Sequence, residues 1–173
     1  ILAWDARQPA RALNLLNTGM KANPLNWQLP FDAAFINAML TADYQAAAAL
    51  FTIASKLPGA WTVAQRWAPY MALKAGDYET AKRMWADIYN GTENRKLREL
   101  AIRQLRNLTL QQTMARLQEA VDRFHAAHGT WPQTLLQLKQ AGYIKNIPEE
   151  PYGGRYYLDQ GKVRTTTPAS QRE

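Results

Sequence analysis

The amino-acid sequence predicts a mainly α-helical chain, in which antiparallel helix hairpins form a solenoid and a small C-terminal α+β appendage ends in a β-hairpin. Three observations support this fold class. Helix-like apolar patterns recur with a period near 34 residues over the first half of the chain. Two further amphipathic stretches follow them. The last part holds glycine- and proline-rich turns and two short runs of β-forming residues.

Composition limits the class of protein and its partners. The 173 residues are 47% apolar and 20% charged, which is typical of a folded chain. The net charge of +7 favours anionic partners, among them nucleic acid, lipid head groups and acidic proteins. The chain has no cysteine, so we expect neither disulfides nor thiolate metal sites. No apolar run reaches the length of a membrane span, and no signal segment is evident.

The repeated unit is a helix, a short turn and a second helix. Ala12, Ala47 and Ala81 lie 35 and 34 residues apart, and a bulky residue follows each of them four positions later. A small residue lets two helices approach closely, and a bulky residue one turn later fills the groove of the neighbouring helix. The segments PFDAAFINAMLTA and TVAQRWAPYMALKAG supply the first helices of the second and third copies. The bulky residues are Leu16, Phe51 and Trp85.

The first copy lacks its first helix, because only ILAWDAR precedes it and the chain has no initial methionine. Each unit of a solenoid buries its apolar face against its neighbours. We therefore expect a fragment or a processed form of a longer protein, with further repeats before residue 1.

These positions resemble the tetratricopeptide repeat. The matching residues are Ala38 and Ala72 in the first helices, and Tyr44, Ala47, Phe51, Ala54, Pro58, Tyr78, Ala81 and Trp85 in and after the second helices. Phe35 and Pro69 depart from the pattern, because they replace the small residue usual near the middle of the first helix. Pro69 has no amide hydrogen, so we expect it to kink or restart its helix. The alternative is a set of unrelated antiparallel hairpins that share the spacing by coincidence.

The resemblance implies a groove lined by the first helix of each hairpin, which can hold a peptide or a partner helix. In this register the candidate partner-binding residues are Asp32, Ile36, Met39, Arg66, Tyr70 and Lys74. The charges of Arg66 and Lys74 favour an acidic partner or a C-terminal carboxylate. Alternatively, the preceding helix or the C-terminal tail covers these residues.

Residues 93–116 are expected to form a degenerate or capping helical region. Over residues 94–108, apolar side chains share one helix face and basic side chains share the other. The basic stripe comprises Arg95, Lys96, Arg98, Arg103 and Arg106. It indicates either a solvated face, which the absence of interleaved aromatic residues favours, or a site for nucleic acid or another anionic surface. Thr109 and Gln112 match a capping box, which predicts that a new helix begins there.

The two histidines, His125 and His128, have a spacing that could place both on one helix face. A metal site needs further ligands, and the sequence offers no cysteine and no suitably spaced acidic residue. We therefore expect no metal site and no cofactor.

The appendage opens with a predicted short helix from near Pro132 to Gly142, because proline favours the first helical turn and glycine the position after the last. The turn-rich segment NIPEEPYGG follows. The runs RYYLD and KVRTT then flank Gln160-Gly161, which is typical of a two-residue hairpin turn.

Residues 117–164 resemble the globular C-terminal region of bacterial pseudopilins of the type II secretion pathway. The shared pattern includes Gly129, Trp131-Pro132, Gly142-Tyr143, Ile147-Pro148 and Pro151-Tyr152-Gly153. The resemblance implies a long helix packed on a short helix and a small sheet, braced by the proline–aromatic–glycine turn. Two family features are not carried over. The apolar helix that builds a filament is replaced by an Arg- and Gln-rich one, and the tail has too few acidic oxygens for calcium.

The predicted organisation is helical repeats over residues 1–92, the capping region over 93–116, the pseudopilin-like unit over 117–167 and a disordered tail over 168–173. Catalysis is not expected, because the sequence has no glycine-rich phosphate loop and no Ser/His/Asp or Cys/His arrangement. The expected function is a non-catalytic protein-interaction scaffold of a bacterial envelope, either periplasmic or membrane-anchored. The alternative is a structural component of a pilus or secretion system that docks through the pseudopilin-like tail.

Overall fold

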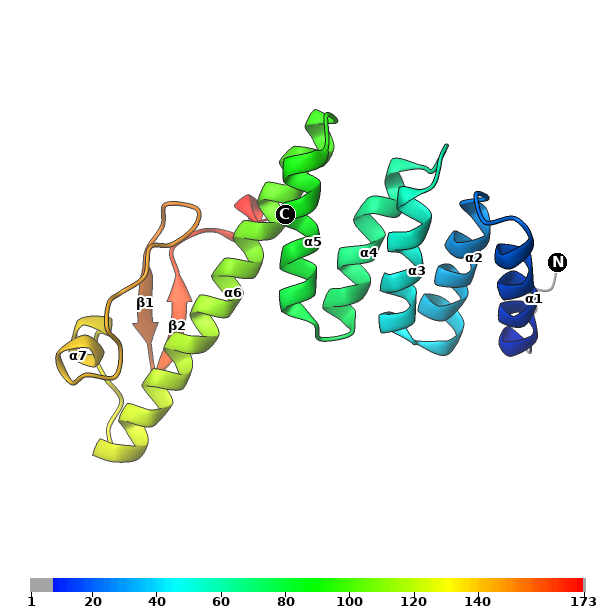
Figure 1. The fold of residues 1–173 in the computed structure, drawn as a ribbon. Coiled ribbons are helices and arrows are strands. Elements are labelled where there is room, and N and C mark those ends of the chain that lie inside the picture. Colours follow the sequence, from blue (N-terminus) through cyan, green and yellow to red (C-terminus); the bar gives the residue numbers. More distant parts are fainter. Residues whose placement is uncertain (1–7, 173) are drawn as a thin grey trace. The chain divides into compact units, whose positions relative to one another are not determined.

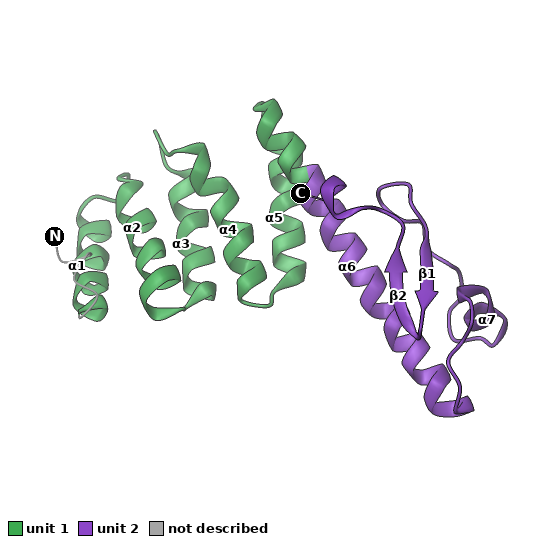
Figure 2. Cartoon of the chain, turned by 180° about the vertical axis from the view of Figure 1, so that it is seen from behind, with its two compact units in different colours: residues 1–101 green, residues 102–173 purple. Residues whose placement is uncertain are grey.

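The computed structural model describes residues 8–172. This part of the chain is mainly helical, and a small antiparallel sheet of two strands lies near its C-terminus (Figure 1). The chain divides into two compact units, residues 1–101 and residues 102–173 (Figure 2). The division falls inside the 34-residue helix α6 (Arg95–His128) rather than in a loop.

Unit 1 is a row of antiparallel helices in which each of the first four packs against the next (Figure 1). The helices are α1 (Pro9–Ala22), α2 (Gln28–Ile36), α3 (Tyr44–Lys56), α4 (Thr62–Lys74) and α5 (Tyr78–Gly91), followed by the beginning of α6. The alanines of the sequence repeat lie in the core: Ala47 and Ala81 are fully buried. Phe51 and Trp85, four residues later, are buried as well, so the predicted pairing of small and bulky residues is present.

The two complete hairpins of unit 1 turn in the same way. Asp43 and Asp77 are the N-caps of α3 and α5, and each accepts a 3.0 Å hydrogen bond from the backbone amide three residues later. The residue before each cap has a left-handed backbone, with φ of 55° at Ala42 and 80° at Gly76. Before the first of these turns, α2 continues into a π-helical turn, Asn37–Thr41, so the two turns are similar without being identical.

Two predicted helix boundaries are absent. Pro69 is buried within α4 and the helix continues through it, so the predicted restart of the helix at Pro69 is wrong. Thr109 does not begin a helix, because it lies in the middle of α6, where its hydroxyl donates to the carbonyl of Leu105 at 2.9 Å. A threonine inside a helix can form this bond to its own preceding turn, so the capping pattern alone did not require a helix end.

Unit 2 packs α7 (Leu135–Gln140) and the strands β1 (Tyr156–Asp159) and β2 (Lys162–Thr165) against the later part of α6 (Figure 2). Tyr156 pairs with Thr165, and Asp159 pairs with Lys162. The connecting residues Gln160 and Gly161 both have positive φ, 49° and 76°, which confirms the predicted two-residue hairpin turn. The common core holds Leu110, Leu117, Ala120, Val121, Phe124, Leu135, Leu138, Tyr156 and Val163.

The limits of the short elements in unit 2 differ from the prediction. Helix α7 begins at Leu135, because the Thr134 hydroxyl caps it by accepting from the Gln137 amide, so its start is not near Pro132. Gly142, with φ of 79°, follows its end as predicted. Residues 169–171 form a 3₁₀ turn, and the Asn107 side chain donates to the Arg172 carbonyl at 2.8 Å. The predicted disorder of residues 168–173 is therefore wrong for the residues described here.

Candidate partner-binding site

Helix α2 exposes a different set of residues from the one predicted. Asp32 is exposed on α2 and Met39 on the π-helical turn, but Ile36 is only 2% exposed and faces the core, so its assignment to an exposed groove is wrong. Phe35 is 43% exposed instead. Partial burial raises the pKa of the Asp32 carboxyl above its usual value.

The size of Phe35 explains this difference. Ala33 and Ala34 are buried almost completely and occupy the part of α2 that contacts the core. With this core-facing part of α2 filled by the two alanines, the larger Phe35 side chain lies on the exposed side of the helix. The sequence carried this signal, since Phe35 was a visible departure from the pattern.

Arg66 of α4 lies in a small open cavity that also brings in Lys96 from the beginning of α6. The cavity has a volume of about 160 Å³, and its remaining lining is Thr62, Val63, Asn94, Leu97 and Leu100. Both cations are exposed, and no carboxylate of the described residues forms a salt bridge with either. Two unpaired cations above a partly apolar cavity are suited to an anionic group of a partner.

The other two predicted residues of α4 are engaged within unit 1. Tyr70 is half-buried, and its ring meets the Trp85 ring edge to face at a centroid distance of 5.2 Å. The Lys74 ammonium lies 5.2 Å from the centre of the Tyr44 ring, a cation–π contact. The exposed candidate residues are therefore Asp32, Phe35 and Met39 from α2 and the π-helical turn, and Arg66 from α4, with Lys96 added beside Arg66 by the structure.

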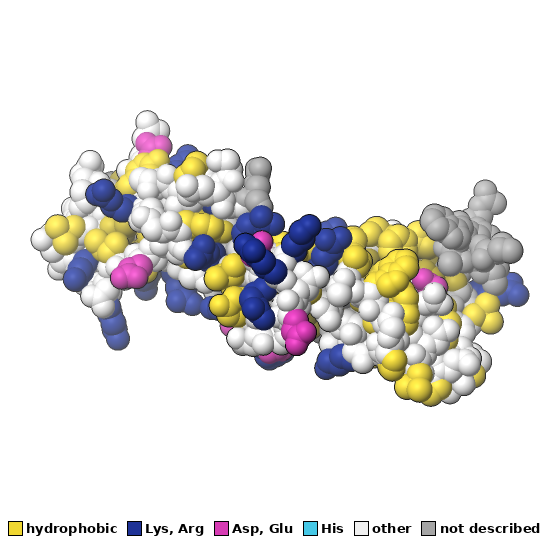
Figure 3. All heavy atoms as spheres, turned by 90° about the horizontal axis from the view of Figure 1, so that it is seen from above, with side chains coloured by type: hydrophobic (Ala, Val, Ile, Leu, Met, Phe, Trp, Pro, Cys, Tyr) yellow, Lys and Arg dark blue, Asp and Glu magenta, His cyan; other side chains and the backbone are white. Residues whose placement is uncertain are grey.

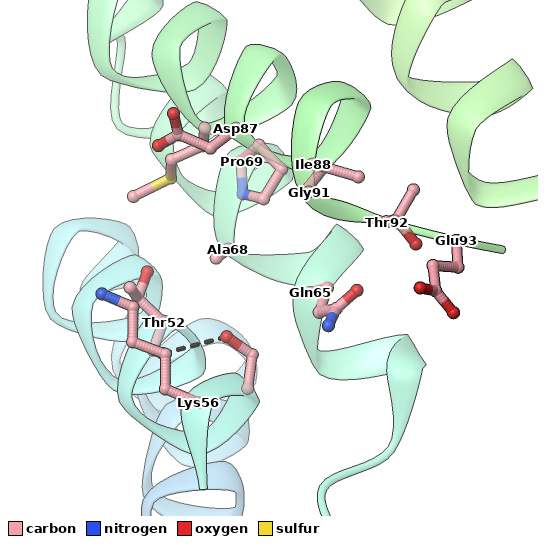
Figure 4. Close-up of a pocket in the computed structure, with 12 residues that line it drawn as sticks. Thr52, Lys56, Gln65, Ala68, Pro69, Asp87, Ile88, Gly91, Thr92 and Glu93 are labelled. Carbon is pink, nitrogen blue, oxygen red and sulfur yellow. Dashed lines mark hydrogen bonds between the residues drawn. The ribbon is translucent and has the colours of Figure 1, made fainter.

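A larger open cavity, which we call the α3–α5 cavity, was not predicted (Figure 4). Its volume is about 510 Å³, and α3, α4 and α5 all contribute to its lining. Lys56 and Asp87 line it from α3 and α5, and Pro69 lies on α4. Pro69 has no amide hydrogen, so it cannot form the usual helical hydrogen bond to the carbonyl of Gln65, which also lines the cavity.

The predicted basic stripe is largely taken up by local contacts. Arg95 forms a 2.8 Å ion pair with Glu99, and Arg98 donates to the carbonyl of Thr92. Farther along α6, in unit 2, the guanidinium of Arg106 lies 5.7 Å from the centre of the Tyr152 ring. These contacts leave no continuous row of free cations along the helix.

Glu150 is a buried side chain of unit 2 with several hydrogen bonds. It is 6% exposed, and its carboxylate accepts from the amides of Tyr152 and Gly154 at 2.8 and 2.9 Å and from the Thr165 hydroxyl at 3.0 Å. Burial acts to raise its pKa, but hydrogen bonds, including one from Thr167, outweigh burial and leave the pKa of Glu150 below its usual value. The carboxylate therefore ties the proline–tyrosine–glycine turn to β2.

The histidines serve packing. The His125 ring stacks on Trp131 with centroids 3.7 Å apart, and His128 lies 3.4 Å from the Tyr143 hydroxyl. Within residues 8–172, no group of three or more histidine, aspartate or glutamate side chains is placed to hold a metal ion.

None of the helices described combines the length and the apolar character needed to cross a bilayer. Comparison with known proteins found no matching family model, no matching curated protein and no matching solved structure.

Proposed function

We propose that the chain is a non-catalytic scaffold for a protein or peptide partner, with tetratricopeptide-like hairpins in unit 1 and a pseudopilin-like module as unit 2. One observation carries the proposal: local geometry recurs at the spacing of the sequence repeat. The caps Asp43 and Asp77 are 34 residues apart, form the same 3.0 Å bond, and follow left-handed residues. Coincidental spacing between unrelated hairpins would not require matching caps, whereas stacked repeats would.

The surface best suited to a partner is the exposed part of the first helices. Phe35 and Met39 offer apolar contact, and Arg66 with Lys96 offers positive charge. A short peptide with an apolar residue and a C-terminal carboxylate or an acidic side chain matches this combination.

The test is a binding titration with fluorescent peptides that differ only in a free or an amidated C-terminus, and in acidic or neutral side chains. We expect the acidic, free-carboxylate peptides to bind. Arg66→Glu should weaken them at least about tenfold, because it places like charges against each other. Arg83→Glu, which changes an exposed cation on α5, is the matched control. Equal affinity for free and amidated neutral peptides, or an equal loss in both variants, would contradict the proposal.

A second candidate is assembly through unit 2, and exposed apolar side chains favour it. Trp131, Ile147 and Tyr157 are each at least 40% exposed on this small unit. Removal of residues 102–173 separates the two functions, because the cut follows the structural division rather than the predicted boundary at 117. Partner binding that survives the removal assigns the site to unit 1. Loss of binding with unit 1 still folded assigns it to unit 2.

A further inference from the structure

Three loops meet at one end of unit 1, which we call the loop end. They join α1 to α2 (residues 23–27), α3 to α4 (57–61) and α5 to α6 (92–94) (Figure 1). The first two lie together, because the rings of Trp27 and Trp61 are 5.2 Å apart. The third lies near the second, because Lys56, Gln65 and Thr92 line the same α3–α5 cavity.

The loop end exposes large apolar side chains on a rigid support. Leu25 is 69% exposed and Trp61 is 62% exposed. The ring centroids of Trp61 and Phe31 are 6.4 Å apart, and those of Phe31 and the buried Phe51 are 5.2 Å apart. Figure 3, which looks onto this end, shows hydrophobic side chains gathered over unit 1. The Trp61 indole is held by Trp27 and Phe31 on one side and is exposed to solvent on the other. It can therefore contact a partner surface with little further loss of side-chain entropy.

Basic residues surround these side chains. Lys21 and Lys56 stand in the last turns of α1 and α3, and α6 brings in three more cations as it begins. The cations at this end are Lys21, Lys56, Arg66, Arg95, Lys96 and Arg98, and the acids are Asp87, Glu93 and Glu99. Glu99 is already paired with Arg95. The opposite end of unit 1 carries the acidic caps Asp43 and Asp77 together with Lys74 in the last turn of α4.

We propose that the loop end binds an anionic lipid surface, with Trp61 and Leu25 at the boundary between head groups and acyl chains and the basic helix ends against the phosphates. Tryptophan favours this boundary, and lysine and arginine near it are attracted to anionic lipids. An acidic polypeptide would account for the cations alone. It would not account for a tryptophan and a leucine exposed at the tips of neighbouring loops, where a planar surface can take up both. The site shares Arg66 and Lys96 with the peptide-binding surface proposed above, whereas Trp61, Leu25, Lys21 and Lys56 belong to the loop end alone.

Sedimentation of the full chain with lipid vesicles tests the inference. One set of vesicles is pure phosphatidylcholine, and the other contains about one quarter phosphatidylglycerol. We expect binding to the anionic vesicles that weakens as salt rises. Each lysine near such a surface contributes about fivefold to partitioning, so Lys21→Gln with Lys56→Gln should reduce it roughly twenty-five-fold. Lys139→Gln, an exposed lysine of unit 2, is the matched control.

Vesicles of brominated lipid report the depth of the indole, because bromine quenches a tryptophan that reaches the acyl chains. We expect quenching of the full chain that Trp61→Phe removes and that Trp131→Phe, at an exposed tryptophan of unit 2, does not. Circular dichroism of each variant checks the fold, and Trp61→Phe keeps an aromatic ring against Trp27. Absence of vesicle binding, or quenching unchanged by Trp61→Phe, overturns the inference. Binding of polyglutamate as tight as that of the vesicles, with no effect of Trp61→Phe on either, assigns the surface to an acidic polypeptide instead.

Discussion

The hairpin of unit 2 needs a glycine at position 161, because a side chain there would collide with Trp131. The φ of Gly161, 76°, is left-handed, and a Cβ atom at this position would lie 2.6 Å from the Cδ2 atom of Trp131. The Trp131 ring is also stacked on His125, which restricts its retreat. We predict that Gly161→Ala destabilises unit 2 by about 2–5 kcal/mol, because backbone strain and overpacking add. Denaturant unfolding followed by near-ultraviolet circular dichroism measures the loss.

Gly153→Ala is the control for this prediction. Gly153 has a similar φ of 84°, but an added Cβ would meet no atom within 4 Å. Only the backbone strain applies there, so we expect a loss of about 1–2 kcal/mol. Equal losses in the two variants would show that the contact with Trp131 is unimportant.

Ala42 is the reverse case, a residue with a side chain where the matching hairpin has glycine. Ala42 and Gly76 both have a positive φ, and each directly precedes an aspartate cap. A Cβ atom added at Gly76 would meet no other atom within 4 Å. We predict that Ala42→Gly stabilises unit 1 by up to about 1 kcal/mol, and that Gly76→Ala destabilises it by a similar amount. Thermal unfolding of the two variants measures these changes. Opposite signs are required, and a loss of stability in both variants would contradict the explanation.

At the scale of elements, the turn at Glu150 connects the chain before β1 to the end of β2. Because the folded-state pKa of Glu150 is below the usual value of 4.5, its contribution to stability is complete above that pH and is lost as the pH falls through the lower folded value. We predict that Glu150→Gln destabilises unit 2 at neutral pH by about 1–3 kcal/mol. The variant should also lose less stability on acidification than the parent protein. Unfolding midpoints across this pH range test both effects.

Glu149→Gln is the matched control, since Glu149 is exposed and adjacent to Glu150. It should leave both the neutral stability and the acid response nearly unchanged, because exposed charges contribute little. An acid response of Glu150→Gln equal to that of the parent protein would place the sensitive carboxylate elsewhere.

The elements that the sequence predicted well are those whose signal is local. The alanine spacing predicted the helices of unit 1, and Gln160-Gly161 predicted the hairpin, because each pattern depends on residues close in the chain. The errors arise where a local sequence pattern allows two structures and tertiary packing decides between them. Thr109 could cap a helix or bond within one, and the continuous α6 required the second.

The candidate surface was predictable only in part for a similar reason. The register implied by the repeat placed Ile36 outward, but Ile36 faces the core and the bulkier Phe35 is exposed. The contribution of Lys96 to the Arg66 cavity could not be read from periodicity, because it brings together residues from α4 and from the beginning of α6. Contacts between elements distant in sequence depend on packing that no local pattern encodes.

At the scale of the whole molecule, residues 8–172 form two hydrophobic cores that fall on different sides of residue 101. The core of unit 1 contains Phe51 and Met71 among buried alanines, and the core of unit 2 is made entirely of residues between 110 and 163. Helix α6 is continuous in the backbone across the division, but its residues contribute to the core of unit 2 and not to the Phe51 core of unit 1. A helix shared in this way need not couple the unfolding of the two cores strongly, because cooperativity follows packing.

We predict that residues 102–173 fold without the rest of the chain. Their core includes side chains from α6, α7 and both strands, and the turn at Glu150 is satisfied within the same range. A unit of this size is near the lower limit for independent folding, so we expect a low but cooperative stability of a few kcal/mol. Urea unfolding of the isolated segment should give one transition, and Gly161→Ala should lower its midpoint. A segment that shows helical circular dichroism but no cooperative transition, and no response to Gly161→Ala, would mean that unit 2 needs unit 1 to form its core.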